Sequence, residues 1–183
     1  MKKYELTAEF IEQWGKKLFR IKALISFGSV EAGELGGYVE KEDNLAQDGD
    51  AWVCDYAWVC DNARVYGNAR VCDDAWVYGN AWVYGNAEVC GNAEVCGNAD
   101  YLLIGRIGSR FSFTTFFKNK DKGITVSCGC FLGTIAEFRA KVTDTHGNNK
   151  HAKMYNLAAD MAELQILGEE HFDKLNTNKS EPF

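Results

Sequence analysis

A six-residue alternation of small, polar and branched positions governs the chain between residues 49 and 102. The third position of each unit is always Ala, and the fifth is Val in the first eight units. Successive side chains of a strand point to opposite faces, so Ala and Val share an inward face while Gly, Asp and Asn form corners. The nine consecutive units are GDAWVC, DYAWVC, DNARVY, GNARVC, DDAWVY, GNAWVY, GNAEVC, GNAEVC and GNADYL.

This period predicts three short sides in each coil, or about 18 residues per coil. Neighbouring coils of a parallel stack lie about 4.8 Å apart, so outward residues separated by one coil become neighbours. We expect Trp58 to stack on Trp76 and Tyr66 on Tyr84. The same reading places Trp52 beside Arg70 and Arg64 beside Trp82, as cation–π neighbours.

The residues before the repeat predict a cap of one helix and one strand. Thr7 is placed to cap a helix over Ala8 to Lys17, with Phe10, Ile11 and Trp14 on one side. The alternation from Leu18 onward predicts a strand reaching Phe27. Such a cap would cover the open end of the first coil, whose exposed strand edge has to be blocked.

The pattern changes again after the repeat. Two strands are predicted, over Ile107 to Lys118 and Gly123 to Phe131, joined by the polar turn 119–122. Thr134 and Glu137 form a capping box that opens a helix reaching about Val142.

A second helix is predicted from about Asn149 to Leu167, and the polar tail after it is expected to be loose. Met154, Leu157, Met161 and Leu164 recur at helical spacing along that helix. The predicted division of the chain is an N-terminal cap (1–36), the repeat (37–104), an α+β unit with a β-hairpin and two helices (105–168) and a polar tail (169–183).

The pattern Val-x-x-x-Ala-x, over Asp43 to Leu102, resembles the hexapeptide repeat of the left-handed parallel β-helix superfamily. That resemblance, and not the residue pattern itself, implies the left-handed sense. The predicted fold is mainly β: a short, three-sided, left-handed parallel β-helix with an N-terminal helix/strand cap and a C-terminal α+β unit.

The full layout also resembles uncharacterised proteins of bacteria, phages and prophages. The segments that carry this second resemblance are 35–40 (LGGYVE), the GNAxV repeats, 104–110 (IGRIGSR) and 128–131 (CGCF).

The charge distribution and the cysteine positions limit the partners and the cellular compartment that we expect for the protein. Residues 43–100 hold eight Asp and two Glu against two Arg, a net charge of −8, whereas 105–168 carry a net charge of +4. An acidic repeat speaks against direct nucleic-acid binding. Five of the seven Cys stand at the sixth repeat position, where we expect reduced, half-buried thiols. With neither a signal peptide nor a membrane span visible, we expect a cytoplasmic protein, in the host cytoplasm if phage-encoded.

Catalytic chemistry has little support in the repeat. Many β-helix enzymes of the resembled superfamily are acyltransferases with a His base, and others bind zinc through His, but residues 49–102 contain no His. His146, His151 and His171 lie downstream. We therefore expect no enzyme activity, no cofactor and no metal. Cys128 and Cys130, which together with His146 and His151 offer a zinc-site alternative, are expected to be core residues of one strand face.

The outward aromatic and arginine residues predict an interface, because Trp, Tyr and Arg are enriched at binding hot spots. They fall on all three sides and so predict a belt, which favours a homo-oligomer (dimer or trimer) or an enveloping host protein. The interface candidates are Trp52, Trp58, Arg64, Tyr66, Arg70, Trp76, Tyr78, Trp82 and Tyr84.

The hypothesis drawn from the sequence is a non-enzymatic binding or assembly protein of phage or prophage type, acting by protein–protein contact, for instance by inhibiting a host defence complex. One alternative is a sponge that sequesters an anionic nucleotide ligand on the basic, Phe-interleaved hairpin. Another is a divergent hexapeptide acyltransferase. The anion-binding candidates are Arg106, Arg110, Lys118 and Lys120.

Overall fold

The computed structural model describes residues 2–177, with side chains as far as 173. The chain divides into two compact units, Met1–Asn98 and Ala99–Phe183. The sequence pattern predicts this boundary after residue 104, but in the structure it lies after residue 98. The reason is that residues 101–107 pair as a strand of the second unit. Residues 178–183, the end of the predicted polar tail, lie outside the described residues.

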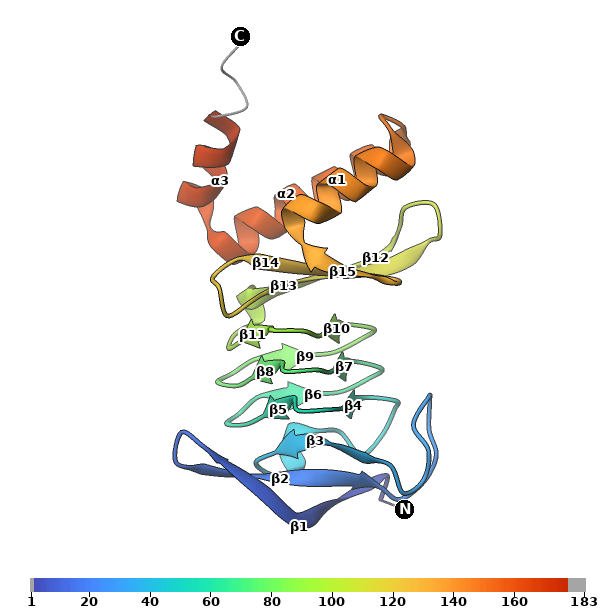
Figure 1. Ribbon diagram of the computed structural model, residues 1–183, viewed down its shortest axis with the longest axis vertical. Helices are drawn as coiled ribbons and strands as arrows, with labels where there is room; N and C mark the ends of the chain where they lie inside the picture. Colours follow the sequence, from blue (N-terminus) through green and yellow to red (C-terminus); the bar gives the residue numbers. More distant parts are fainter. Residues whose placement is uncertain (1, 178–183) are drawn as a thin grey trace. The chain divides into compact units, whose positions relative to one another are not determined.

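The repeat forms a β-solenoid of about 3 turns (Figure 1). Each side of a coil contributes a strand of two residues, and strands on the same side pair in parallel. The mainly β fold with a β-solenoid is therefore confirmed, whereas its left-handed sense stays a prediction. The repeat strands are β4 (Trp52–Val53), β5 (Trp58–Val59), β6 (Arg64–Val65), β7 (Arg70–Val71), β8 (Trp76–Val77), β9 (Trp82–Val83), β10 (Glu88–Val89) and β11 (Glu94–Val95).

Three outer faces result from this pairing. The first carries β5, β8 and β11, the second β4, β7 and β10, and the third β6 and β9. Trp58 lies opposite Trp76, and Arg64 opposite Trp82, as the sequence period predicts. These three faces differ in what covers them, and that difference positions the candidate site.

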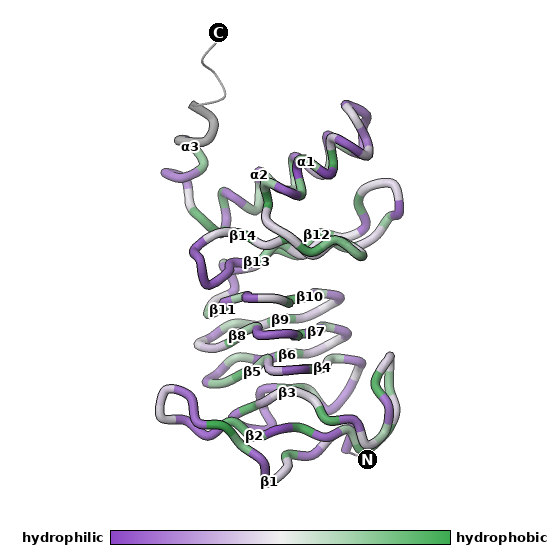
Figure 2. Tube along the Cα trace, viewed as in Figure 1, coloured by the Kyte–Doolittle hydropathy of each residue, from purple (hydrophilic) through white to green (hydrophobic). Residues whose placement is uncertain are grey.

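The inside of the solenoid is uniform. Every repeat Ala from Ala51 to Ala93 and every repeat Val from Val53 to Val95 has no exposed surface. The predicted inward face is confirmed, because strand alternation leaves these two positions no other side to occupy. In Figure 2 hydrophilic and hydrophobic residues alternate within each coil accordingly.

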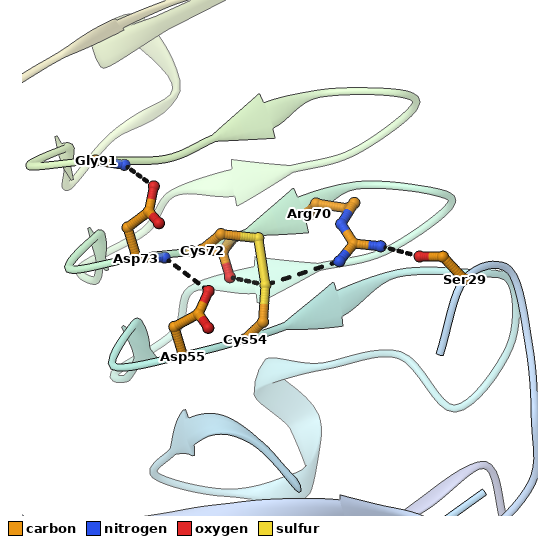
Figure 3. Close-up of a disulfide and its surroundings, with 8 residues drawn as sticks. Ser29, Cys54, Asp55, Arg70, Cys72, Asp73 and Gly91 are labelled. Atoms are coloured by element: carbon orange, nitrogen blue, oxygen red, sulfur yellow. Dashed lines mark hydrogen bonds between the residues drawn. A yellow bond between two sulfur atoms is a disulfide. The ribbon is translucent and has the colours of Figure 1, made fainter. Parts of the chain in front are cut away.

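The corners depend on the first repeat position. Asp55, Asp61 and Asp73 have φ values of 55°, 60° and 58°, and Gly takes the same left-handed backbone region at this position in other coils. The Asp side chains also join coils: the Asp73 backbone N–H donates to the Asp55 carboxylate at 3.3 Å, and the Gly91 N–H donates to Asp73 at 2.8 Å (Figure 3). Each of these two Asp corners thus satisfies a backbone donor of the next coil.

The N-terminal segment is a β-hairpin, and the predicted helix over Ala8 to Lys17 is wrong. Strands β1 (Tyr4–Gln13) and β2 (Lys16–Ala23) pair antiparallel. The other edge of β2 pairs antiparallel with β3 (Leu35–Val39), and β3 in turn pairs in parallel with β5 of the repeat. A strand here supplies partners for the backbone edge of the first coil, which a helix cannot do. The capping role is retained with a different element.

The second unit is a four-stranded antiparallel sheet with helices α1 and α2 on one face (Figure 1). The two predicted strands correspond to β13 and β14, and two further strands, β12 and β15, lie almost wholly outside the predicted segments. Gly108 and Gly129, at positive φ, lie in the turns that join these outer strands to β13 and β14. Its elements are β12 (Tyr101–Ile107), β13 (Ser112–Lys118), β14 (Ile124–Cys128), β15 (Phe131–Thr134), α1 (Ile135–His146), α2 (Lys150–Leu167) and α3 (Glu169–Thr177). Two short 3-10 turns, Glu42–Asn44 and Asn98–Asp100, complete the described chain.

The capping box at the start of α1 is confirmed. The Glu137 N–H donates to the Thr134 hydroxyl at 3.3 Å, and the Glu137 carboxylate accepts from the Thr134 N–H at 2.8 Å. The expected loose tail is wrong from 169 to 177, where α3 forms. Among the helices described, none is long and apolar enough to cross a membrane.

Helix α2 faces the sheet with small residues and Tyr155, not with its large apolar stripe. Ala152, Ala158, Ala159 and Ala162 are at most 4% exposed. By contrast, the residues of the Met/Leu stripe remain open to solvent: Met154 at 40%, Leu157 at 63%, Met161 at 56% and Leu164 at 45%. The small residues allow α2 to approach α1 and the sheet closely.

Candidate functional site

The first face of the solenoid is covered by the tip of the N-terminal hairpin. The Trp14 ring lies 4.9 Å from the Trp58 ring and 5.0 Å from the Tyr78 ring, both edge-on. Trp58 is 3% exposed and stacks on Trp76 at 5.1 Å, as predicted. The first face is therefore an internal contact of the chain.

An ion pair holds that hairpin in place. The Lys16 ammonium pairs with the Asp61 carboxylate, which also accepts a hydrogen bond from the Gly79 N–H at 3.3 Å. The hydrogen bond with Lys16 lowers the pKa of Asp61 and raises the pKa of Lys16. The Trp14 side chain is thereby kept over the aromatic rings.

The second face is covered near its start by the segment between β2 and β3. The Trp52 ring has no exposed surface and lies edge-on to Tyr4 at 6.3 Å and to Phe27 at 5.4 Å. Arg70 lies opposite Trp52 in register, and its guanidinium donates to the Ser29 hydroxyl and to the Cys54 sulfur (Figure 3). Trp52 consequently has no surface to offer a partner.

The third face keeps its aromatic rings exposed. Trp82 is 47% exposed and Tyr84 is 49% exposed. The predicted stack of Tyr66 on Tyr84 is confirmed, with centroids 5.2 Å apart and planes 11° from parallel. Trp82 meets Tyr66 edge-on at 6.5 Å, and its backbone N–H is bound by the Asn98 side chain at 2.8 Å.

A hollow of about 540 Å³ lies beside these rings on the same face. Tyr66, Trp82 and Arg64 form one wall, and the segment 42–47 forms the other. Gln47 is fixed there, because its side-chain oxygen accepts from the Lys3 N–H at 2.8 Å. The hollow therefore combines aromatic surface with the guanidinium of Arg64 and the carboxylates of Glu42 and Asp43.

These observations correct the predicted belt. The prediction treated Trp52, Trp58, Trp76 and Tyr78 as surface, but the chain's own N-terminal segment lies over their faces. Among the aromatic interface candidates, Trp82 and Tyr84 on the β6/β9 side stay about half exposed. Trp14 and Tyr56, which are not among those candidates, are also exposed. Sequence reasoning missed Trp14 as a cover and Gln47, Glu42 and Asp43 as wall residues, because their proximity to the repeat depends on pairing across the sheet.

The repeat thiols are partly oxidised. Cys54 and Cys72 form a disulfide (Figure 3), with Cα atoms 4.7 Å apart. The expectation of reduced thiols throughout is wrong at this pair, whose Cα separation falls in the range of about 4.4–6.8 Å that disulfides span. Burial raises the pKa of Cys60 and of Cys90 to about 12, so these thiols are poor nucleophiles near neutrality.

Cys60 also belongs to a cluster with Glu40 and Asp61, whose ligand atoms lie within 4.8 Å of one another. Glu40 accepts a hydrogen bond from the Asp61 backbone N–H at 2.6 Å, and Asp61 pairs with Lys16. The two carboxylates thus bind groups of the chain itself, and the cluster serves to anchor the hairpin.

In the second unit the predicted cations do not form one group. Lys118 pairs with Asp100 at 3.4 Å, Arg106 is exposed on β12, and Lys120 lies in the turn after β13. Arg110, however, lines a separate hollow of about 400 Å³ together with Cys128 and Cys130. Cys130 is exposed in the β14–β15 turn, which corrects its predicted place in the core.

Comparison with known proteins names no family. No protein-family model matches the chain, and no curated protein matches it. The geometry of the two hollows and of the exposed faces is therefore the basis for inferring function.

Proposed function

We propose that this protein is a non-enzymatic binding protein that recognises a protein partner through the β6/β9 face of its solenoid. One observation carries the proposal: Trp82 and Tyr84 stay about half exposed beside a 540 Å³ hollow, whereas the chain itself covers Trp52 and Trp58. Among the aromatic residues predicted for the interface, this pair exposes the most surface for a contact with a partner.

The physical basis is the cost of leaving such rings in water. Exposed Trp and Tyr side chains bring large apolar area and a polar tip to an interface, and little rotamer freedom is lost on binding. Here Tyr66 and Tyr84 brace each other by stacking, so the surface is organised before a partner arrives. Arg64 on one wall and Asp43 on the other give the hollow both charges, which favours a partner side chain of mixed character.

A host protein is the partner we propose, with inhibition of a host defence complex as the consequence. The support is the resemblance of the layout to uncharacterised phage and prophage proteins, carried by the GNAxV repeats and by 104–110. The separate resemblance of the Val-x-x-x-Ala-x repeat to the hexapeptide superfamily supports the left-handed sense of the solenoid. We also propose a cytoplasmic site of action. A rigid solenoid face suits this role, because it does not have to fold on binding.

The decisive experiment compares matched aromatic variants in capture from host lysate. Trp82→Ala combined with Tyr84→Ala should abolish recovery of a specific partner, and the circular dichroism spectrum should be unchanged. Tyr56→Ala is the control, since Tyr56 is 69% exposed but lies outside the hollow. Equal recovery with both variants would refute the proposed face, as would equal loss.

A second observation favours self-association. Met154, Leu157, Met161 and Leu164 follow each other at intervals of three, four and three residues on the outer side of α2, and all are at least 40% exposed. That alternation is typical of the seam between two helices of a coiled coil. We propose that the stripe pairs with the same stripe of a second copy, since a seam that matches itself gives a closed twofold dimer.

The oligomeric state tests this pairing. Light scattering should give twice the chain mass for the wild-type protein and the chain mass for Leu157→Glu. Lys153→Glu, an exposed position on the same helix outside the stripe, is the control and should remain dimeric. A monomeric wild-type protein at micromolar concentration would overturn the pairing, but would leave the β6/β9 proposal standing.

A further inference from the structure

The hollow of about 400 Å³ in the second unit has the character of a small-molecule site. Its walls come from the β12–β13 turn, the β14–β15 turn and the facing sides of α1 and α2. A volume of this size suits a ligand of small-metabolite dimensions, since such sites run from about 300 to 1,000 Å³. All of its lining residues lie between 109 and 155, so the site belongs to one unit.

The polar lining is cationic and hydroxylic. Its members are Arg110, Lys141, His146, Ser109, Ser112 and Thr145. Among the described residues that line the hollow, none is Asp or Glu. The nearest carboxylate partner on α1 is Asp144, which pairs with Lys141 at 3.6 Å, and both side chains are more than 60% exposed. Such an exposed pair is weak, so Lys141 is free to turn toward an anion.

The apolar lining is a set of interlocked rings. Tyr155 is 6% exposed and meets Phe138 edge-on at 5.6 Å. The His146 ring lies nearly parallel to Tyr155, with centroids 5.8 Å apart, and Phe131 lies 5.7 Å from Phe138. These rings line the hollow with apolar surface, and Phe131 and His146 are the two that stay partly exposed.

The turn that carries Arg110 is built onto these rings. Gly108 has a φ of 73°, and a Cβ atom there would overlap the Tyr155 hydroxyl group. Only Gly therefore lets the β12–β13 turn close over the ring and present Ser109 and Arg110 to the hollow. On the other side, the Thr114 hydroxyl donates to the Cys128 sulfur at 3.2 Å, which fixes the thiol beneath the β14–β15 turn.

The protonation state of Tyr155 agrees with this arrangement. Burial, followed by the neighbouring Cys128 thiol, raises the pKa of Tyr155, and the positive charge of Arg110 acts in the opposite direction. The phenol thus keeps its proton near neutral pH and brings no negative charge to the hollow. An incoming anion meets only neutral and positive groups there.

We propose that this hollow binds a small organic anion in which a phosphate group is joined to a planar ring, the chemistry of a nucleoside monophosphate. Arg110 binds the phosphate, because its planar fork matches phosphate oxygens in pairs, and Lys141 adds a second charge. The planar ring lies against Phe131 and His146, the partly exposed rings of the lining. Arg106, Lys118 and Lys120 take no part, which narrows the cation set predicted from the sequence.

Calorimetry with defined probes tests the site. The four ribonucleoside monophosphates, inorganic phosphate and adenosine are titrated into the full chain. We expect saturable binding of at least one monophosphate, with phosphate alone and adenosine alone each at least tenfold weaker. Arg110→Gln and Lys141→Gln should each weaken binding about tenfold or more, because each removes a charge-assisted contact.

The control is Arg106→Gln, which removes an exposed Arg of the adjacent strand that does not line the hollow. It should bind like the wild-type protein, and the helical circular dichroism of all variants should match. Absence of saturable binding up to millimolar concentration would overturn the site. If inorganic phosphate binds as tightly as the nucleotides, the proposed ring contact is overturned. If Arg106→Gln weakens nucleotide binding as much as Arg110→Gln does, the loss reflects overall charge, and the proposed role of Arg110 is overturned. None of these outcomes bears on the β6/β9 face, because its residues lie in the other unit.

Discussion

The two units of this protein bury their interiors by different means. In the solenoid the same two small side chains, Ala and Val, repeat in coil after coil with no exposed surface. In the second unit a few large rings, among them Phe116 and Phe138, fill a core between one sheet face and two helices. A closed coil leaves the chain no choice of inner face, whereas a helix on a sheet can turn either of its apolar sides inward. The outer stripe of α2 is the result of that freedom.

The covering of outward residues also differs. The solenoid's outer rings are shielded by its own N-terminal hairpin on the first face and by the segment before β3 on the second, and they remain open on the third. In the second unit, one side of α2 packs in the core, and the Met/Leu stripe on its other side stays exposed. We propose contacts with other molecules at the two surfaces that the chain's own segments leave exposed, namely the β6/β9 face and the outer stripe of α2.

The five Trp residues all stand before residue 99, and α1 to α3 all stand after it. Tryptophan fluorescence therefore follows the solenoid, and the helical circular dichroism signal follows the second unit. Each substitution below is measured by urea unfolding with both probes.

The largest loss is expected for Phe116→Ala in the second unit. Phe116 has no exposed surface and meets Phe138 edge-on at 5.7 Å. Removing a buried ring leaves a cavity that neighbouring side chains cannot fill, so the free energy of unfolding should fall by about 3–5 kcal/mol. The helical signal should report this loss, and an unchanged helical transition would show that the core is not the one described.

A smaller and repeatable loss is expected for Val77→Ala in the solenoid. Val77 is fully buried, and so is Val71 on the adjacent side. The fluorescence transition should lose about 1–3 kcal/mol for either substitution. The two values should agree within about 0.5 kcal/mol, because each repeat contacts only its neighbours. Widely different losses of unfolding free energy for the two substitutions would show that the solenoid core is not uniform from one side to the next.

A pH effect of about 1 kcal/mol is expected from Lys3. Its ammonium is buried and donates to the Ala51 carbonyl at 2.9 Å, and burial lowers the pKa of Lys3 from 10.5 to about 8. The unfolded chain holds the proton up to about pH 10, so between the two pKa values it binds more protons than the folded chain. Stability should therefore rise from pH 7 to pH 9 by about 1 kcal/mol relative to Lys3→Met, as followed by fluorescence. A parallel pH profile in the two proteins would contradict the lowered pKa.

The smallest effect is expected for Leu157→Gln. Leu157 is 63% exposed on the outer stripe of α2, so the unfolding free energy of the monomer should change by less than about 0.5 kcal/mol. The matched control is Ala158→Gln, one residue further along but 4% exposed, which should cost several times more because it overfills the core. The reverse order would mean that α2 is turned the other way round.

Much of this architecture follows from local pattern. The Ala/Val interior, the Tyr66–Tyr84 and Trp58–Trp76 stacks, and the Thr134–Glu137 capping box all depend on residues at fixed sequence offsets. Strand alternation and helix-start chemistry need no information from elsewhere in the chain. These features were predictable for that reason, and the structure confirms them.

What the sequence by itself determined is the repeat and the direction in which each of its side chains points. The tertiary structure decided the rest. It made residues 4–23 a hairpin, because β2 satisfies the open backbone edge that begins at β3. It covered two aromatic faces and left the Trp82 face exposed, and it turned the Ala side of α2 inward. The covering of the faces and the orientation of α2 depend on contacts between residues distant in sequence. A local sequence pattern does not predict such contacts.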